Sequence, residues 1–262
     1  MKKAISILAV VFLVVLCAGC LAEESNSAPK TGTEVATVFA APDIQPFTEA
    51  DGSQEKLDTI WIYYTDGTFE QFAEVDDKAL LFSNGTYELV GDADFVLENN
   101  GADNGQIIIR RETKLSSTKG LEDFQTEDVV ELSSPGLTQL YAPDAGRKID
   151  AAFYGIDKQP YTGKDGEQDM LDTWWLYFSD GTFEQYAIVD DEPKDRVVLF
   201  STGRYQLRDG SSFIYEKKSD ESSFLTIQRE KKLSPDGLVP YESSHEYELS
   251  TLGFVRIISI DR

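Results

Sequence analysis

The sequence has few of the residues on which most metal-binding and nucleotide-binding sites depend. It contains two cysteines, Cys17 and Cys20, and one histidine, His245, in 262 residues. A zinc site needs three or four thiolate, imidazole or carboxylate ligands in a defined arrangement, and a set of Cys and His ligands is absent. The glycines stand in turn-forming pairs rather than in a strand-to-helix phosphate loop, which argues against nucleotide chemistry.

The shortage of histidine also bears on catalysis. Any Ser-His triad would have to use His245, whose neighbours Ser243 and Ser244 show neither a nucleophile elbow nor an oxyanion motif. We therefore expect His245 to be an exposed loop residue. Glu70 and Glu184 could form the carboxylate pair of a hydrolase, but acids are so common here that the pair alone indicates no reaction. The sequence predicts a protein that is not an enzyme and has no cofactor.

Basic residues are scarce relative to acids: 24 Lys and Arg stand against 47 Asp and Glu, a formal net charge of −23. Such a surface repels phosphate backbones and anionic lipid, so we predict no nucleic-acid partner. A cationic partner or calcium is compatible with it. The acidic loops lack the spacing and the glycine of an EF-hand, so no metal site is predicted.

No apolar run reaches the length of a membrane-spanning helix, but the N-terminus has a shorter one. Two lysines precede an apolar run at 4–16 and small residues that end at Cys20, which is the pattern of a secretory signal peptide over residues 1–19. The stretch "LCAGC" resembles the lipobox of bacterial lipoproteins, although Cys17 stands where that family most often has Leu. The resemblance implies that Cys20 is lipidated and becomes the mature N-terminus, anchored through two or more acyl chains.

The residues after Cys20 predict a flexible connection to the membrane. Residues 20–35, including "LAEESNSAPKTGTE", are small and polar and have no apolar periodicity. With Cys17 removed, the mature chain has no second cysteine for an internal disulfide. We therefore expect a domain held by its lipid on the extracytoplasmic side of a bacterial envelope membrane.

The rest of the chain is an internal duplication. "LDTIWIYYTDGTFEQFA" from Leu57 matches "LDTWWLYFSDGTFEQYA" from Leu171 without a gap, and "IRRETKLS" at Ile109 matches "IQREKKLS" at Ile227. "VELSSPG" and "YELSTLG" also correspond. The correspondence covers nearly the whole mature chain, so we predict two β-domains, a first repeat at 36–143 and a second repeat at 144–262.

Each repeat has the pattern of short antiparallel strands. Asp66-Gly67 and Asn84-Gly85 lie between apolar runs and predict two-residue hairpin turns, the first of type I′. Counting these hairpins and the runs near Val38, Phe95, Ile107, Val130 and Leu137 gives about eight strands, with a short helix at 121–126. The predicted fold is all-β, an antiparallel barrel or sandwich in each repeat.

The Asp-Gly-Thr-Phe hairpin followed by a Gly-x-Tyr-x-Leu strand resembles the small lipocalin-like (calycin) domains of many bacterial lipoproteins. That resemblance implies an up-and-down barrel. It implies no reaction, because one fold serves many functions.

The first hairpin of each repeat carries the candidate binding residues. With the two-residue turn, Tyr64 would oppose Phe69 and Ile62 would oppose Gln71, so both faces of the hairpin would be apolar. The N-terminal strand, a short helix or the other repeat could cover the aromatic face. Otherwise that face lines a ligand cavity or a partner groove, whose contacts would be Trp61, Tyr63, Glu70, Phe72, Trp175, Tyr177, Glu184 and Tyr186.

Three functions follow from these patterns. The first is a non-catalytic, membrane-anchored lipoprotein whose duplicated β-domains bind a small apolar ligand or an envelope protein. The second is a structural protein of envelope assembly or stress sensing, and the third is a carboxylate-based hydrolase. A concave aromatic pocket in each domain would favour ligand binding, and filled barrels with an exposed flat patch would favour partner binding. Converging carboxylates in a cleft would favour the hydrolase.

Overall fold

The computed structural model describes residues 33–76, 78–95, 105–132, 136–142, 147–189, 195–213, 223–249 and 255–259. Within these ranges every regular element is a β-strand, which confirms the predicted all-β class. The same residues include no helix that is long and apolar enough to cross a membrane. The predicted signal peptide, Cys20 and most of the tether lie outside the described residues.

The first repeat forms one seven-stranded antiparallel sheet in the order β6-β5-β4-β3-β2-β1-β7. Strands β1 to β6 form a meander in which consecutive strands pair, and β7 returns to pair with β1, so β6 and β7 are the edge strands. The strands are β1 (Val35–Thr48), β2 (Gln54–Tyr64), β3 (Thr68–Val75), β4 (Lys78–Leu89), β5 (Gln106–Ser116), β6 (Gly120–Glu131) and β7 (Thr138–Tyr141).

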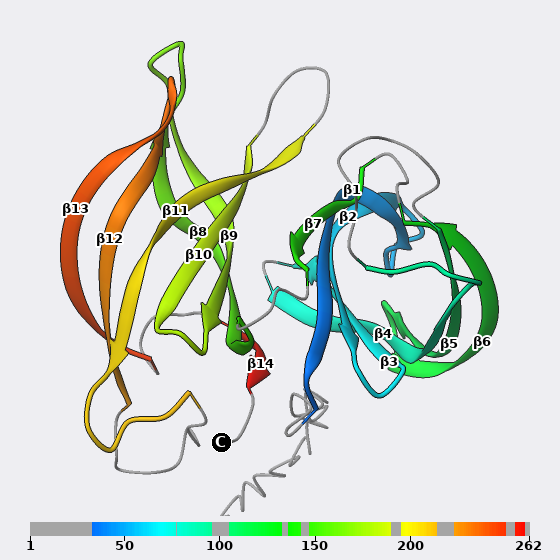
Figure 1. The fold of residues 1–262 in the computed structure, drawn as a ribbon. Coiled ribbons are helices and arrows are strands. Elements are labelled where there is room, and N and C mark those ends of the chain that lie inside the picture. Colours follow the sequence, from blue (N-terminus) through cyan, green and yellow to red (C-terminus); the bar gives the residue numbers. More distant parts are fainter. Residues whose placement is uncertain are drawn as a thin grey trace, which may run out of the picture.

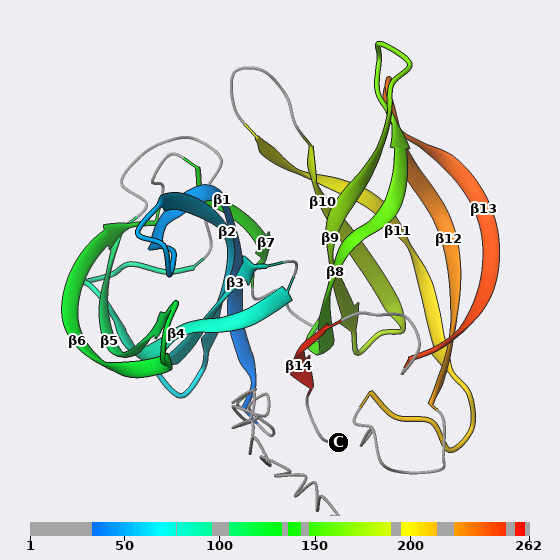
Figure 2. The ribbon, with the colours of Figure 1, turned by 180° about the vertical axis from the view of Figure 1, so that it is seen from behind.

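The second repeat forms a sheet of the same topology, in the order β13-β12-β11-β10-β9-β8-β14. Both sheets are strongly curled and stand side by side (Figures 1 and 2). The strands are β8 (Ile149–Thr162), β9 (Gln168–Phe178), β10 (Thr182–Val189), β11 (Arg196–Leu207), β12 (Phe224–Ser234), β13 (Gly237–Glu248) and β14 (Val255–Ser259).

The repeated Asp-Gly stretch does form a hairpin, between β2 and β3, but its turn is not the predicted type I′. The amide of Gly67 donates a hydrogen bond to the carbonyl of Tyr64 at 3.1 Å. Gly67 has a φ of 82°, whereas the φ of Asp66 is not positive. This is a type I turn followed by a left-handed glycine. The Asp66 carboxylate stabilises the turn by accepting hydrogen bonds from the amide and the hydroxyl of Thr68, at 3.0 and 2.5 Å.

The longer turn shifts the hairpin register by one residue. Tyr63, and not the predicted Tyr64, stands opposite Phe69. The pairing of Ile62 with Gln71 is wrong for the same reason, because Trp61 takes that place. Since successive side chains of a strand point to opposite faces, a shift of one residue changes which residues share a face.

The corrected register separates the predicted site residues. Phe69 lies on the concave face beside Trp61, whereas Glu70 and Phe72 lie on the convex face with Tyr64. The two-residue turn predicted from the sequence would place Phe72 and Glu70 with Trp61, and Phe69 with Tyr64. The same division holds in the second repeat, where Trp175, Tyr177 and Phe183 are concave and Phe178, Glu184 and Tyr186 are convex.

The Asn84-Gly85 pair, predicted to be a second turn, lies inside strand β4. A Cβ atom on Gly85 would lie 2.0 Å from the carbonyl oxygen of Arg110, and one on Gly203 would lie 2.0 Å from that of Gln228. Glycine is therefore required here because β5 and β12 approach these positions closely, and not because the chain reverses.

Two further expectations need correction. Residues 121–126, predicted as a short helix, belong to strand β6, where Leu121 pairs with Leu115. The run near Phe95 is in no strand, so the described part of each repeat has seven strands rather than eight. Pairing with β5 outweighs the local helical spacing of Leu121 and Phe124, as tertiary context commonly does.

The core has an inner and an outer part. The concave face of each sheet buries its own aromatic cluster. The convex faces of β1–β3 and β8–β10 pack against each other and form one cluster that joins both repeats. We call this second cluster the inter-repeat interface; its largest members are Tyr64, Phe72, Tyr141, Tyr154, Trp174 and Phe178.

Candidate functional site

The concave faces hold four of the predicted contact residues in nearly identical stacks. In the first repeat the Trp61 ring lies 5.6 Å from Phe69 and 6.3 Å from Tyr63, measured between centroids. In the second, Trp175 lies 6.2 Å from Tyr177 with the same near-parallel orientation. Burial raises the pKa of the Tyr63 and Tyr177 hydroxyls well above the usual range.

An arginine on β5 or β12 approaches each tryptophan ring. The guanidinium carbon of Arg111 lies 5.2 Å from the centroid of Trp61, and that of Arg229 lies 5.2 Å from Trp175. These distances are within the range of cation–π attraction. Both arginines occupy the third position of the repeated "IRRETKLS" and "IQREKKLS" stretches, so the duplication itself was the signal that could have revealed them.

The two arginines differ in their counter-charge. Arg111 forms an ion pair with Asp128 on β6. The corresponding position on β13 is His245, since Asp128 pairs with Ile109 and His245 with Ile227. Among the described residues no acid forms an ion pair with Arg229, which is 8% exposed and whose Nε is buried without a hydrogen-bond partner.

The concave face of the first repeat contains an apolar pocket of about 300 Å³. Its walls come from β1, β2, β5 and β6, which are brought together by the curl of the sheet. Arg111 is its one charged lining residue, and Gln45 and Thr59 are polar. The remaining lining residues are Phe39, Ala41, Ile44, Pro46, Trp61, Tyr63, Ile107, Ile109, Val130, Leu132 and Leu137.

The other four predicted contact residues lie on the convex faces, away from this pocket. Phe72 and Tyr186 pack in the inter-repeat interface, where the other repeat covers the hairpin. Glu70 is buried there and accepts a hydrogen bond from the Tyr64 hydroxyl at 2.7 Å. The predicted set of contacts is therefore divided between a pocket and an intramolecular interface.

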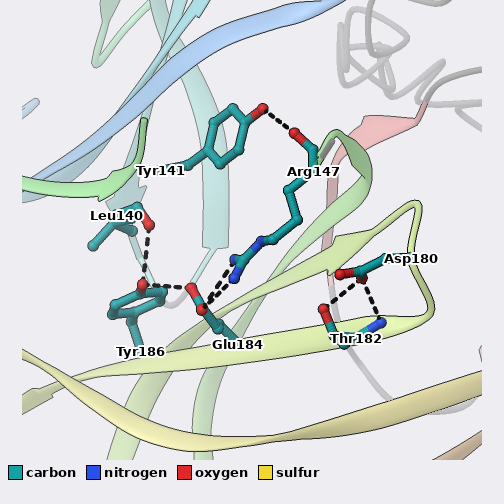
Figure 3. A network of polar contacts seen from close by, with 7 residues as sticks. All are labelled: Leu140, Tyr141, Arg147, Asp180, Thr182, Glu184 and Tyr186. Carbon is teal, nitrogen blue, oxygen red and sulfur yellow. Dashed lines mark hydrogen bonds and ion pairs between the residues drawn. The ribbon is translucent and has the colours of Figure 1, made fainter. Parts of the chain in front are cut away.

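A polar network holds the interface on the side of the second repeat (Figure 3). The Arg147 guanidinium lies 3.0 Å from a Glu184 carboxylate oxygen and 3.6 Å from the Phe178 ring centroid. The Tyr186 hydroxyl lies 2.7 Å from Glu184 and 2.9 Å from the carbonyl oxygen of Leu140 in the first repeat. Burial, and next the Glu184 charge, raise the pKa of Tyr186 well above its usual range.

Three carboxylates meet at the edge of the interface. Ligand atoms of Asp58, Glu74 and Asp172 lie within 4.8 Å of one another, and this is the one such group found among the described residues. They line an acidic cleft of about 700 Å³. Lys56 is the one basic residue in its wall. Carboxylate oxygens are the ligands that calcium and magnesium prefer, so these three side chains are the ones in the described chain that could hold a cation.

The electrostatics of this group favour a proton on Glu74. Burial raises the pKa of Glu74 to about 7, the negative charge of Asp172 adds to the shift, and a hydrogen bond from the Tyr154 hydroxyl opposes it. Glu74 and Asp172 belong to different repeats, so this carboxyl is a point at which pH acts on the interface.

The remaining catalytic candidate does not assemble a site. His245 is exposed, as predicted, but it lies on the edge strand β13 and not in a loop. Its ring lies 6.2 Å from that of Tyr247, and the neighbouring Ser243 hydroxyl is buried without a hydrogen-bond partner. Glu70 and Glu184 each bond to a tyrosine hydroxyl on the convex face of their own repeat.

Comparison with protein-family models, curated proteins and solved structures finds no match for this chain. The candidate site therefore stands on its geometry alone.

Proposed function

We propose that the protein is an extracytoplasmic lipoprotein, anchored through Cys20, whose first repeat binds a small apolar ligand without catalysing a reaction. The observation that carries this proposal is the pocket beside Trp61. A ligand site is typically a concave apolar cavity of roughly 300–1,000 Å³ with a few placed polar groups, and this pocket lies at the small end of that range. The curled meander of strands is compatible with a lipocalin-like barrel.

The convex hairpin face supports this choice over a protein partner. The residues that could have formed an exposed aromatic groove, Phe72 and Tyr186 among them, are covered by the other repeat. A partner would have to separate the repeats to reach them. The pocket needs no such rearrangement.

Tryptophan fluorescence of the full chain, titrated with octanoate, tests the proposal. Trp61 lines the pocket, whereas Trp174 and Trp175 belong to the interface and to the second core. We expect a saturable change that is lost in Trp61→Phe and kept in the matched Trp175→Phe variant. A change that persists in Trp61→Phe would place binding elsewhere and contradict the proposal.

The anchor is tested separately. Cys20→Ser should release the protein from the membrane fraction, and the neighbouring Leu21→Ser should leave it there. Retention of the Cys20→Ser chain on membranes would contradict the lipid anchor, without affecting the ligand-binding part of the proposal.

A further inference from the structure

Building on the proposed function, we infer that Val130 decides which repeat binds, that Tyr247 closes the second repeat at the corresponding position, and that the ligand carries an acidic group. Val130 lies on β6 directly opposite Ile107, and Tyr247 lies on β13 directly opposite Leu225. These are equivalent places in the two sheets. At this wall position the first repeat has a small side chain and the second repeat has a large aromatic one.

Packing shows where the tyrosine goes. The Tyr247 ring packs against the aromatic cluster of the second repeat, and its hydroxyl acts on the pKa of the Tyr177 hydroxyl. Val130, in contrast, borders the open pocket. Trp175 is accordingly 1% exposed, whereas Trp61 is 8% exposed. The repeat with the more exposed tryptophan has valine at this wall position, and the repeat with the more buried tryptophan has tyrosine there.

The indole N–H groups of the two tryptophans also differ in their hydrogen bonds. In the second repeat, Trp175 Nε1 donates to the Thr173 hydroxyl at 3.1 Å. In the first, the equivalent Thr59 donates to the carbonyl of Ala41, and Trp61 Nε1 has no hydrogen-bond partner among the described residues. A donor at the wall of an apolar pocket is suited to an acceptor on the ligand.

The charge beside that donor indicates the class of acceptor. Arg111 lines the same pocket and stacks on the same ring. Its ion pair runs from one nitrogen, Nη1, to Asp128, whose side chain is half exposed. A carboxylate on the ligand can accept hydrogen bonds from both the indole N–H and the guanidinium. An alcohol is uncharged and cannot form an ion pair with Arg111. The ligand class is therefore a short, apolar carboxylic acid.

Equilibrium dialysis of the full chain in nonionic detergent, with detergent alone as the blank, tests this inference. The probes are labelled octanoate and 1-octanol. We expect one equivalent of octanoate per chain, bound at least about tenfold more tightly than octanol. Equal binding of the two probes would overturn the assignment of the acidic group.

A reciprocal exchange tests the wall position. Val130→Tyr should remove octanoate binding, and Tyr247→Val should raise the stoichiometry toward two. Near-ultraviolet circular dichroism confirms that each variant is folded. If the wild type binds but Val130→Tyr binds equally well and Tyr247→Val still takes one equivalent, the inference fails and the proposed function stands. If the wild type binds neither probe, the proposed function fails, and this inference with it.

Discussion

The two repeats share the sequence Asp-Gly-Thr-Phe-Glu-Gln, yet a different tyrosine supplies the hydroxyl that bonds the glutamate in each repeat. In the first, the hydroxyl that bonds Glu70 is on Tyr64. In the second, the residue equivalent to Tyr64 is Phe178, and the hydroxyl that bonds Glu184 is on Tyr186. A hydroxyl lost at one position is replaced at a neighbouring one, so the requirement for a donor is kept while the residue that meets it changes.

The concave faces show the opposite behaviour. There the aromatic stack is retained almost atom for atom, but its surroundings differ: Val130 becomes Tyr247 and Asp128 becomes His245. The convex faces have adjusted to keep one shared interface, whereas the concave faces have diverged. Two copies of one unit can thus share one interface while the residues around their aromatic stacks differ.

The largest expected difference between the repeats concerns the stacked tryptophans. Trp175→Ala should lower the free energy of unfolding by about 4 kcal/mol, because it leaves a cavity in a filled core. Trp61→Ala should cost roughly 2–3 kcal/mol, because one side of that ring already borders a pocket. Urea unfolding measures both. Equal losses would mean that the two cores are equally filled.

The next difference lies in the ion pairs of the interface. Arg147→Met should cost about 2 kcal/mol, because Glu184 stays partly buried without its partner. The adjacent Lys148→Met removes an exposed pair with Glu34, 3.0 Å apart, and should cost less than about 0.5 kcal/mol. The same unfolding experiment compares them, and a loss as small for Arg147 as for Lys148 would contradict a stabilising role for the network.

The pH dependence of the interface follows from Glu74. Its pKa is about 7 in the folded chain against a usual value of 4.5, so the folded state holds a proton that the unfolded state releases. Stability from this group is complete below about pH 4.5 and is lost as pH rises through 7. After allowance for solvent screening the loss is about 1–2 kcal/mol.

Glu74→Gln keeps an acceptor for the Tyr154 hydroxyl but does not titrate. We expect it to be more stable than the wild type at pH 8 and equally stable at pH 4.5. Thermal unfolding across this range measures the difference. If the wild type is more stable than Glu74→Gln at pH 8, the negative charge of Glu74 stabilises the folded chain. That result would contradict the expected pH dependence.

The smallest effect is expected at the two arginines. Arg229→Met removes a buried charge that has no acidic partner among the described residues, so it should be neutral or stabilise by up to about 1 kcal/mol. Arg111→Met removes an ion pair and should destabilise slightly. Chemical unfolding measures the change in the free energy of unfolding for each variant. If Arg229→Met is destabilising, the stacking of Arg229 on Trp175 outweighs the cost of burying the charge.

Much of this fold could be predicted from the sequence. The same strand pattern occurs in both repeats, and the alternation of apolar and polar residues indicates which face of a strand is buried. The register of the first hairpin could not, since Asp-Gly is compatible with both a two-residue turn and a type I turn with a following bulge. That choice depends on the hydrogen bond from Gly67 to Tyr64, and it alone reverses the faces of Phe69 and Phe72.

The candidate site was predictable in its aromatic half and not in its charged half. Trp61 and Tyr63, two of the aromatic residues chosen from the sequence, line the pocket, and their contact with a ligand stays a prediction. Val130 and Arg111 come from strands on the far side of the curl, and only the curvature of the sheet brings them opposite Trp61. Curvature arises from bulges and close backbone approaches, such as that at Gly85, which no periodicity reveals.

The outer edge strands have a consequence for encounters between molecules of this protein. β6 carries five acids and no basic residue, and β13 carries three acids and Pro240. An open sheet edge can pair with a strand from a neighbouring molecule. The negative charges along β6 and β13 repel one another, so they oppose backbone pairing between two molecules that meet through these edges.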